Sequence, residues 1–397
     1  MEPEWHGHFT ELVSFVTTNT CIRIDSETID IPSDVRKQFY ELFDLVRKSF
    51  VEEHFASQLV KGQTLCNAWA EVNASIEQSG FGPIEIHPEL NWFMLNPIDG
   101  LKRQLYNALF SLLRSEIDLQ TFGKQGHKLV SDAFDKFYRL GYMYWIQLAL
   151  FTALQADKNY RVPVIDSVAD VLMGEGHENP GDHLGNVPAL EECTTVTFIQ
   201  QPIVSFMAPR IILHSTKLQQ LLGLCTDFVE PQWRTNELNN TLEWYNLPAL
   251  LKAHNLEKPR PDYKMPIEFT RIMSDILVYT THSSDDIRLV ADYYHFLRPD
   301  LCLDVMEQPD WYEKGGLEII KKRHSVMRPR RGTYILCLEQ PQQAVIDELA
   351  PKQLVVPNAR DQQENTMIVD HVQDLRLLHC GLDVQQLGML VDILGVE

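Results

Sequence analysis

The chain has 397 residues, of which 44% are hydrophobic and 23% are charged, a balance typical of globular proteins. Its formal net charge of −20 disfavours non-specific binding to nucleic acid or to an anionic membrane. The length is that of two or three domains. The seven cysteines are widely spaced and form no C-x-x-C motif, which indicates reduced thiols in a cytoplasmic protein rather than a structural zinc site.

Residues 1–160 are predicted to form a mainly helical domain. The segment 21–31 alternates apolar and polar side chains around a central turn, which predicts a small β-hairpin. We expect a helix to begin at Ser33, with this residue as its N-cap, and to continue to Lys61 with one apolar stripe. A second helix is expected over 65–77.

The rest of this domain contains two further helical patterns. Asn96 and Pro97 form a typical helix start, with the amide as cap and the proline at the first helical position. Residues 127–155 are apolar nearly all round in their second half, as in the central helix of a bundle. The apolar run 142–154 is too short to cross a bilayer, and the N-terminus shows no leader pattern, so we expect no membrane association.

Residues 161–332 are predicted to be a mixed α/β region with irregular, proline-rich connections. Residues 194–214 are rich in β-branched side chains and contain two prolines, which predicts two or three short strands. Further expected elements are a strand at 161–165 and helices over 166–173, 218–224, 267–279 and 285–298, the last capped by Ser284.

Residues 333–397 are predicted to be a small C-terminal α/β unit. A buried strand over 333–338, a helix over 342–349 and a strand over 353–357 follow one another, an order that favours parallel pairing. The chain is then expected to end on two short helices separated by Gly381, the last one capped by Asp383. The fold class that we predict is therefore mixed α+β, with a predominantly helical N-terminal half.

The segment GEGHENPGDHLGN, residues 174–186, raises three interpretations. Glu175, His177, Asp182 and His183, together with the neighbouring Glu178, are of the types that bind zinc, iron or manganese. The intervening Asn-Pro-Gly-Asp favours a turn over a rigid ligand frame, however, and no Lys-Ser or Lys-Thr follows as in a phosphate-binding loop. We favour a plain loop, and we expect no cofactor.

The segment KKRHSVMRPRR, residues 321–331, is strongly basic within an acidic chain. The interpretation that we favour is pairing with acidic groups of this same chain across a domain junction. The alternatives are a docking patch for an acidic partner and a local phosphate-contacting patch for nucleic acid. The residues that would make such a partner- or phosphate-binding site are Lys321, Lys322, Arg323, Arg328, Arg330 and Arg331.

Motifs for catalysis give weaker patterns. Pro309-Asp310 followed by Glu318 and Lys321 resembles a metal-nuclease arrangement, but the last spacing is Glu-x-x-Lys on a predicted helix. Residues 282–286, HSSDD, are explained as a helix cap with acids in the first turn. The sequence therefore favours a non-enzymatic interaction protein, such as a scaffold or regulatory subunit with a protein partner. The alternatives are a metal-assisted hydrolase or nuclease, using carboxylates near Asp304, Glu307 and Asp310, and a nucleic-acid-contacting module.

Overall fold

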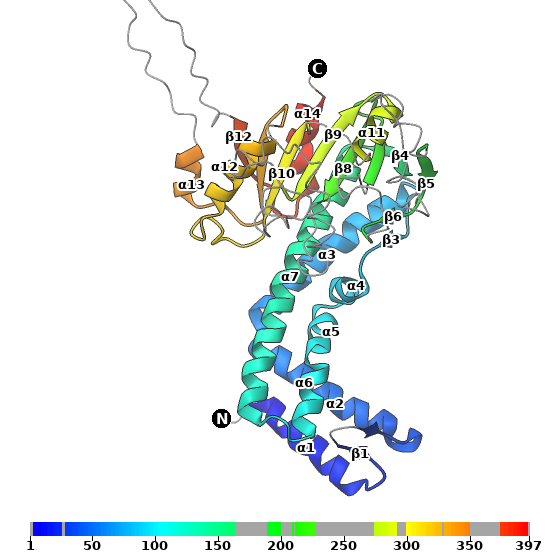
Figure 1. The fold of residues 1–397 in the computed structure, drawn as a ribbon, viewed down its shortest axis with the longest axis vertical. Coiled ribbons are helices and arrows are strands. Elements are labelled where there is room, and N and C mark those ends of the chain that lie inside the picture. Colours follow the sequence, from blue (N-terminus) through cyan, green and yellow to red (C-terminus); the bar gives the residue numbers. More distant parts are fainter. Residues whose placement is uncertain are drawn as a thin grey trace, which may run out of the picture. The chain divides into compact units, whose positions relative to one another are not determined.

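A computed structural model describes residues 3–25, 28–162, 189–199, 209, 211–226, 274–291, 299–327, 329–349 and 374–395. The chain forms two compact units, one made of residues 1–71 and 86–145 and the other of residues 72–85 and 146–397. The division into 1–160, 161–332 and 333–397 stays a prediction. The protein is a mixed α+β protein, with a helical N-terminal half and a mixed sheet in the middle and C-terminal regions (Figure 1).

The first unit is built from helices and one small hairpin, which begin and end as follows: α1 (Glu4–Thr18), β1 (Arg23–Ile24), β2 (Ile29–Asp30), α2 (Ser33–His54), α3 (Ala56–Gln78), α4 (Pro88–Leu95), α5 (Pro97–Lys102), the 3-10 turn η1 (Arg103–Leu105), α6 (Tyr106–Leu113) and α7 (Leu119–Ala153). Helices α3 and α7 continue into the second unit. The predicted hairpin is confirmed, with Ile24 opposite Ile29 in an antiparallel pair.

The expected helix from Ser33 to Lys61 is wrong in its second part. Helix α2 ends at His54 because Phe55 leaves the helical conformation, with φ −128° and ψ 26°, and α3 begins directly afterwards. The Phe55 side chain is fully buried, so one apolar stripe continues across a break in the helix. Ser33 is the first helical residue and not the cap, since Pro32 occupies the cap position.

Two predictions about the later helices are confirmed. The Asn96 side chain accepts a hydrogen bond from the backbone N–H of Ile98 at 3.0 Å, and Pro97 is the first residue of α5. Helix α7 starts earlier than predicted, at Leu119, but its residues 140–151 are all buried. This segment of α7 carries apolar side chains nearly all round because it is buried all round.

The second unit contains an eight-stranded sheet in the order β12-β11-β10-β9-β8-β7-β4-β5. The strands of this sheet are β4 (Ala156–Arg161), β5 (Glu191–Cys193), β7 (Ile211–Ser215), β8 (Gln220–Thr226), β9 (Ile276–Thr281), β10 (Leu301–Met306), β11 (Thr333–Cys337) and β12 (Leu375–His379). Strands β10, β11 and β12 are parallel, whereas the remaining pairs are antiparallel. Separately, β3 (Ile84–Glu85) pairs with β6 (Val196–Thr197).

Helices cover both faces of this sheet. On one face lie α11 (Ser284–Ala291) and α12 (Gly316–Met327), since Ile287 packs near Gly223 and His324 binds Thr333 at 2.9 Å. The C-terminal turns of α7 lie against the opposite face, where Gln147 accepts a hydrogen bond from the Thr226 hydroxyl at 2.9 Å. Helices thus lie on both faces of the sheet, which explains why its central strands consist mainly of buried apolar side chains.

Several predictions for the second unit need correction. Residues 220–226 form strand β8 and not a helix, and 276–279 belong to strand β9. The first of the two expected terminal helices is strand β12. Each is a short apolar run whose periodicity does not separate a buried strand from a buried helix, and pairing with neighbouring strands decides the outcome. Strand β10 was not among the expected elements.

Other predictions for the second unit are confirmed. Strand β11 and helix α13 (Gln343–Leu349) lie where expected. Strand β11 pairs in parallel with β12, whereas the parallel partner that we expected, 353–357, lies outside the described residues. Asp383 accepts a hydrogen bond from the backbone N–H of Gln385 at 2.9 Å, and it caps the 3-10 turn η5 (Val384–Leu387) before α14 (Gly388–Leu394). The predicted cap at Ser284 is wrong, because the Ser283 hydroxyl accepts the hydrogen bond from the backbone N–H of Asp285 and Ser284 is the first residue of α11.

Some predicted elements lie outside the described residues: the helix 166–173, the strand 353–357, and the ends of the helices predicted over 267–279 and 285–298. Within the described ranges, none of the helices combines the length and apolar character that a membrane crossing needs.

Candidate functional site

The basic segment 321–331 is brought to the second unit's sheet by helix α12. Lys321 pairs with Glu318 one turn earlier at 2.8 Å and with Glu348 of α13 at 2.7 Å. Hydrogen bonds to these two carboxylates raise the pKa of Lys321. Lys322 lies on the same helix, and Arg328 lies outside the described residues. The ammonium group of Lys321 is therefore already shared between two acids.

Arg323 is held by two buried carboxylates. Its guanidinium binds Asp304, in the middle of β10, and lies 3.7 Å from Asp275, which precedes β9. The Ser274 hydroxyl donates to Asp304 at 3.1 Å, and the backbone N–H of Val305 donates to Asp275 at 2.7 Å. The two acids thus share one cation within the sheet layer.

Burial dominates the electrostatics of this cluster. Asp304 has no exposed surface, and desolvation raises its pKa to about 6, while the nearby Arg323 acts in the opposite direction. The carboxylate of Asp275 acts with desolvation, since two negative charges close together disfavour each other's ionisation. The buried carboxylates are bound to Arg323 rather than turned to an open surface.

The topology explains why these residues meet. Residues 302, 304 and 306 of β10 point to the face that α12 covers, and α12 is the crossover between the parallel strands β10 and β11. The crossover returns the basic segment over the strand that carries Asp304. The sequence indicated that the basic segment needs acidic partners. It did not identify Asp275 and Asp304, because both lie outside the segment and meet Arg323 only in the fold.

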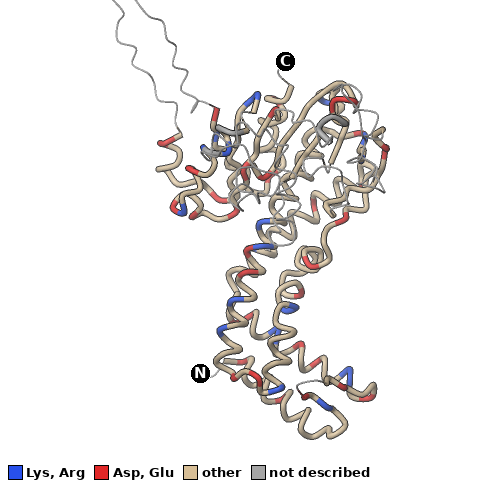
Figure 2. Tube along the Cα trace, in the orientation of Figure 1, with Lys and Arg blue, Asp and Glu red and all other residues tan. Residues whose placement is uncertain are grey.

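Arg330 and Arg331 precede strand β11, and they contact Asp300 and the end of α14. Arg330 is half-exposed and lies 3.6 Å from Asp300. Arg331 donates to the backbone carbonyls of Ile393 and Leu394, both at 2.7 Å, at the end of α14. Carbonyls in a last helical turn lack intrahelical partners and carry partial negative charge. Asp and Glu positions of the second unit are interspersed with these Lys and Arg positions (Figure 2).

The residues considered for metal chemistry do not form one described site. Glu175, His177, Glu178, Asp182 and His183 lie outside the described residues. In the part of the chain that the structure describes, no group of three or more His, Cys, Asp or Glu side chains is placed to hold a metal ion.

The nuclease-like pattern takes a different form in the structure. Glu318 and Lys321 face each other as an ion pair on α12, and Asp310 pairs with Lys314 at 2.7 Å. Asp304 is fully buried against Arg323. These charged groups bind one another in separate pairs.

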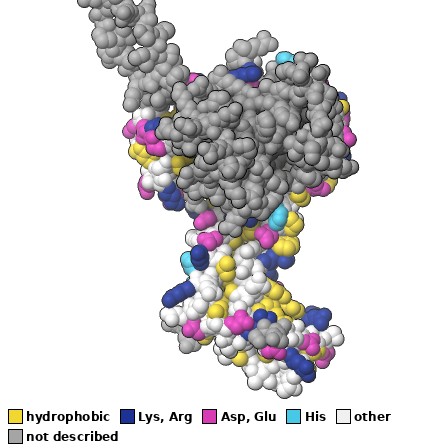
Figure 3. Space-filling model, viewed as in Figure 1, with side chains coloured by type: hydrophobic (Ala, Val, Ile, Leu, Met, Phe, Trp, Pro, Cys, Tyr) yellow, Lys and Arg dark blue, Asp and Glu magenta, His cyan; other side chains and the backbone are white. Residues whose placement is uncertain are grey.

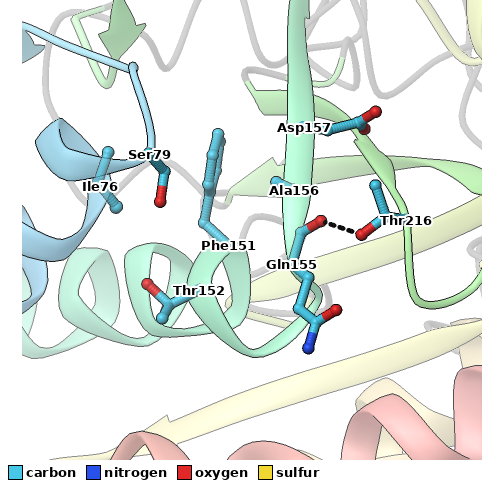
Figure 4. Close-up of a pocket in the computed structure, with 8 residues that line it drawn as sticks. All are labelled: Ile76, Ser79, Phe151, Thr152, Gln155, Ala156, Asp157 and Thr216. Atoms are coloured by element: carbon cyan, nitrogen blue, oxygen red, sulfur yellow. Dashed lines mark hydrogen bonds between the residues drawn. The ribbon is translucent and has the colours of Figure 1, made fainter.

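A pocket of about 330 Å³ lies in the second unit, between the end of α3, the end of α7 and the start of β4. Figure 4 shows the Asp157 carboxylate turned away from Phe151 and Ser79, and Asp157 binds His214 Nδ1 at 2.6 Å. The Gln155 carbonyl accepts a 2.8 Å bond from the Thr216 hydroxyl. The pocket is thus lined by hydroxyl groups and a ring, while its one carboxylate faces elsewhere.

A different surface lies on the first unit, and we call it the Trp92 surface. It consists of Tyr40, Trp92, Leu95, Arg103 and Tyr106. The guanidinium carbon of Arg103 lies 3.5 Å from the centre of the Trp92 ring, a close cation–π stack. Leu95 follows Trp92 by three residues on α4, so both lie on one side of that helix, and the Leu95 side chain is 74% exposed.

The other half of this surface is aromatic. Tyr106 begins α6 three residues after Arg103, and its hydroxyl lies 3.5 Å from that of Tyr40 on α2. Burial and this hydrogen bond raise the pKa of Tyr106 to about 12, although the residue as a whole is 38% exposed. Figure 3 shows that hydrophobic side chains reach the exterior of the helical unit.

Charged side chains lie next to Tyr106 and Arg103. Arg47 contacts the Phe43 and Tyr106 rings and binds Asp44. Lys102 binds Asp44 at 3.3 Å and Asp99 at 2.8 Å.

The sequence reasoning did not find the Trp92 surface. The local indication for it is that Trp92 and Leu95 are apolar residues three positions apart, just before the helix start at Asn96 and Pro97. The contact with Tyr40 had no such signal, because it joins residues that are far apart in the chain.

No family model matches this chain, and neither the search of curated proteins nor that of solved structures returned a similar protein.

Proposed function

We propose that this chain is a non-enzymatic interaction protein, a scaffold or regulatory subunit of a larger cytoplasmic assembly, which binds a protein partner through the Trp92 surface. The observation that carries the proposal is the exposure of Leu95 beside the stacked pair of Trp92 and Arg103. Trp, Tyr and Arg are the residue types that dominate binding energy at protein interfaces. A scattered exposed leucine is ordinary, but one next to these anchors forms a continuous patch.

The energetics favour covering this patch. Burying a leucine side chain contributes roughly 1.5–3 kcal/mol. Trp92 and Arg103 are already held in one geometry by their stacking, so less conformational entropy is lost when a partner binds them. The cytoplasmic setting is supported by the seven cysteines, which are widely spaced in the sequence and form no C-x-x-C motif.

The proposal is tested by purification of the tagged chain from its native cells at moderate salt, with nuclease-treated controls and mass spectrometry. We expect a stoichiometric protein partner that rebinds when it is purified. Leu95→Asp should abolish the association, whereas Leu129→Asp should preserve it. Leu129 is the matched control, because it is a 43% exposed leucine on α7 outside the Trp92 surface. A partner retained by Leu95→Asp, or no partner at all, would contradict the proposal.

A further inference from the structure

We propose that the partner presents a carboxylate to Arg103, flanked by apolar side chains that cover Leu95 and Trp92. This inference rests on the proposed function and specifies the chemistry of its partner. The occupant is an acidic–apolar peptide segment of another protein.

The first step is the state of Arg103. Its flat face is occupied by the Trp92 ring at 3.5 Å. An arginine that stacks through its face keeps the N–H donors on its edge available, in the fork geometry that fits a carboxylate with two hydrogen bonds. Arg103 is exposed, and among the described residues no acid forms an ion pair with it.

The second step is the comparison with the neighbouring cations. Arg47 and Lys102 both bind Asp44, and Lys102 also binds Asp99. Of these three cations, Arg103 is the one that forms no ion pair with an acid among the described residues. One positive charge remains at the Trp92 surface of a chain whose formal net charge is −20. This local excess selects a carboxylate-bearing segment over a basic one.

The third step is the apolar surrounding. Leu95 follows Trp92 by three residues and Tyr106 follows Arg103 by three residues, and both side chains have exposed apolar surface. A partner that covers them removes water from Arg103, and an unpaired desolvated guanidinium is costly. The segment that fits best therefore combines an Asp or Glu with adjacent aliphatic or aromatic side chains. A nucleic acid fits less well, because the field of the whole chain repels a polyanion.

The experiment uses the full-length chain and a displayed library of random short peptides. The wild type should select peptides in which Asp or Glu neighbours an apolar residue. For the best peptide, replacing its acid by the matching amide should weaken binding about tenfold in fluorescence polarisation, and Arg103→Gln should remove this discrimination. Arg103→Glu should select Lys or Arg at the same peptide position. Leu129→Asp should behave as the wild type in every measurement.

The outcomes separate the two proposals. Peptides that depend on Leu95 but show no acid preference would overturn the carboxylate inference and leave the proposed function standing. Selection of peptides unaffected by Leu95→Asp would count against the proposed function itself. Binding of single-stranded oligonucleotide that is lost in Arg103→Glu would overturn the peptide occupant. So would self-association of the wild type in sedimentation that Arg103→Glu disrupts, since a second copy would then cover this surface.

Discussion

The guanidinium of Arg323 binds the carboxylate of Asp304, a residue with no exposed surface in the middle of strand β10. Two residues earlier on the same helix, Lys321 binds acids that are partly exposed. The basic segment therefore contains two kinds of cation. Arg323 is buried between helix α12 and the sheet, and Lys321 lies near the protein surface. This difference has consequences for stability.

Arg323→Ala should destabilise the second unit much more than Lys321→Ala. Removing Arg323 leaves two buried carboxylates without their shared cation, which typically costs about 3–5 kcal/mol. Lys321 makes a surface pair, and its removal should cost at most about 1 kcal/mol. The measurement is the free energy of unfolding from urea titration. Equal losses in both variants would show that the Arg323 contacts contribute no more than a surface pair.

Asp304→Asn should alter the pH dependence of stability. The pKa of Asp304 in the folded protein is about 6, above the ordinary value of 3.8. Between these pH values the folded chain keeps a proton that the unfolded chain has released, so stability falls as pH rises through this window and stays constant above it. The wild type should lose stability relative to the variant on going from pH 4 to pH 6, on the order of 1 kcal/mol per pH unit.

The check is urea unfolding of both proteins at several pH values, with Asp310→Asn as the control, since Asp310 is partly exposed. Because Asp275 keeps a contact with Arg323, the variant retains one acid beside the buried cation. A stability difference between wild type and Asp304→Asn that does not change with pH would contradict the raised pKa.

Gly100→Ala should weaken the support of the Trp92 surface. A Cβ at this position would lie 2.6 Å from the backbone Cα of Phe93, so α4 and α5 would have to move apart. We expect a loss of about 1–3 kcal/mol. Gly123→Ala is the matched control within helix α7, where an added Cβ meets nothing within 4 Å and should stabilise by about 0.5–1 kcal/mol. The reverse order in thermal unfolding would contradict the packing.

Arg331→Ala should free the end of α14. The variant loses two charge-assisted hydrogen bonds to the carbonyls of Ile393 and Leu394, and we expect a loss of about 1–3 kcal/mol. Arg330→Ala, which removes a half-exposed side chain 3.6 Å from Asp300, should cost less than about 1 kcal/mol. Hydrogen exchange should locate the Arg331→Ala effect in residues 388–395. Exchange there that matches the wild type would rule out this role.

The sequence predicted the elements whose signals are local. The hairpin at 21–31, the Asn96 cap, strand β11 and the Asp383 cap each depend on side chains within a few residues of one another. The helix break at Phe55 was missed because the apolar stripe continues across it. Periodicity reports which side is buried, and it does not report a local change of backbone direction.

Strands β8, β9 and β12 were not predictable in this way. Each is a short apolar run that becomes a strand because other strands lie beside it. The same limit applies to the site. The basic segment was visible in the sequence, but its partner Asp304 and the contact between Tyr40 and Tyr106 depend on segments that meet only after folding. Pairing between distant segments leaves no pattern in either segment alone.

From β7 to β12, each strand of the sheet lies next to the strand that precedes it in the chain. The sheet therefore extends in one direction as the chain proceeds, and no later strand has to be inserted between two earlier ones. During synthesis from the N-terminus, each emerging strand finds its neighbour already made. The sheet can thus grow at a single edge, in the order in which the ribosome releases its strands.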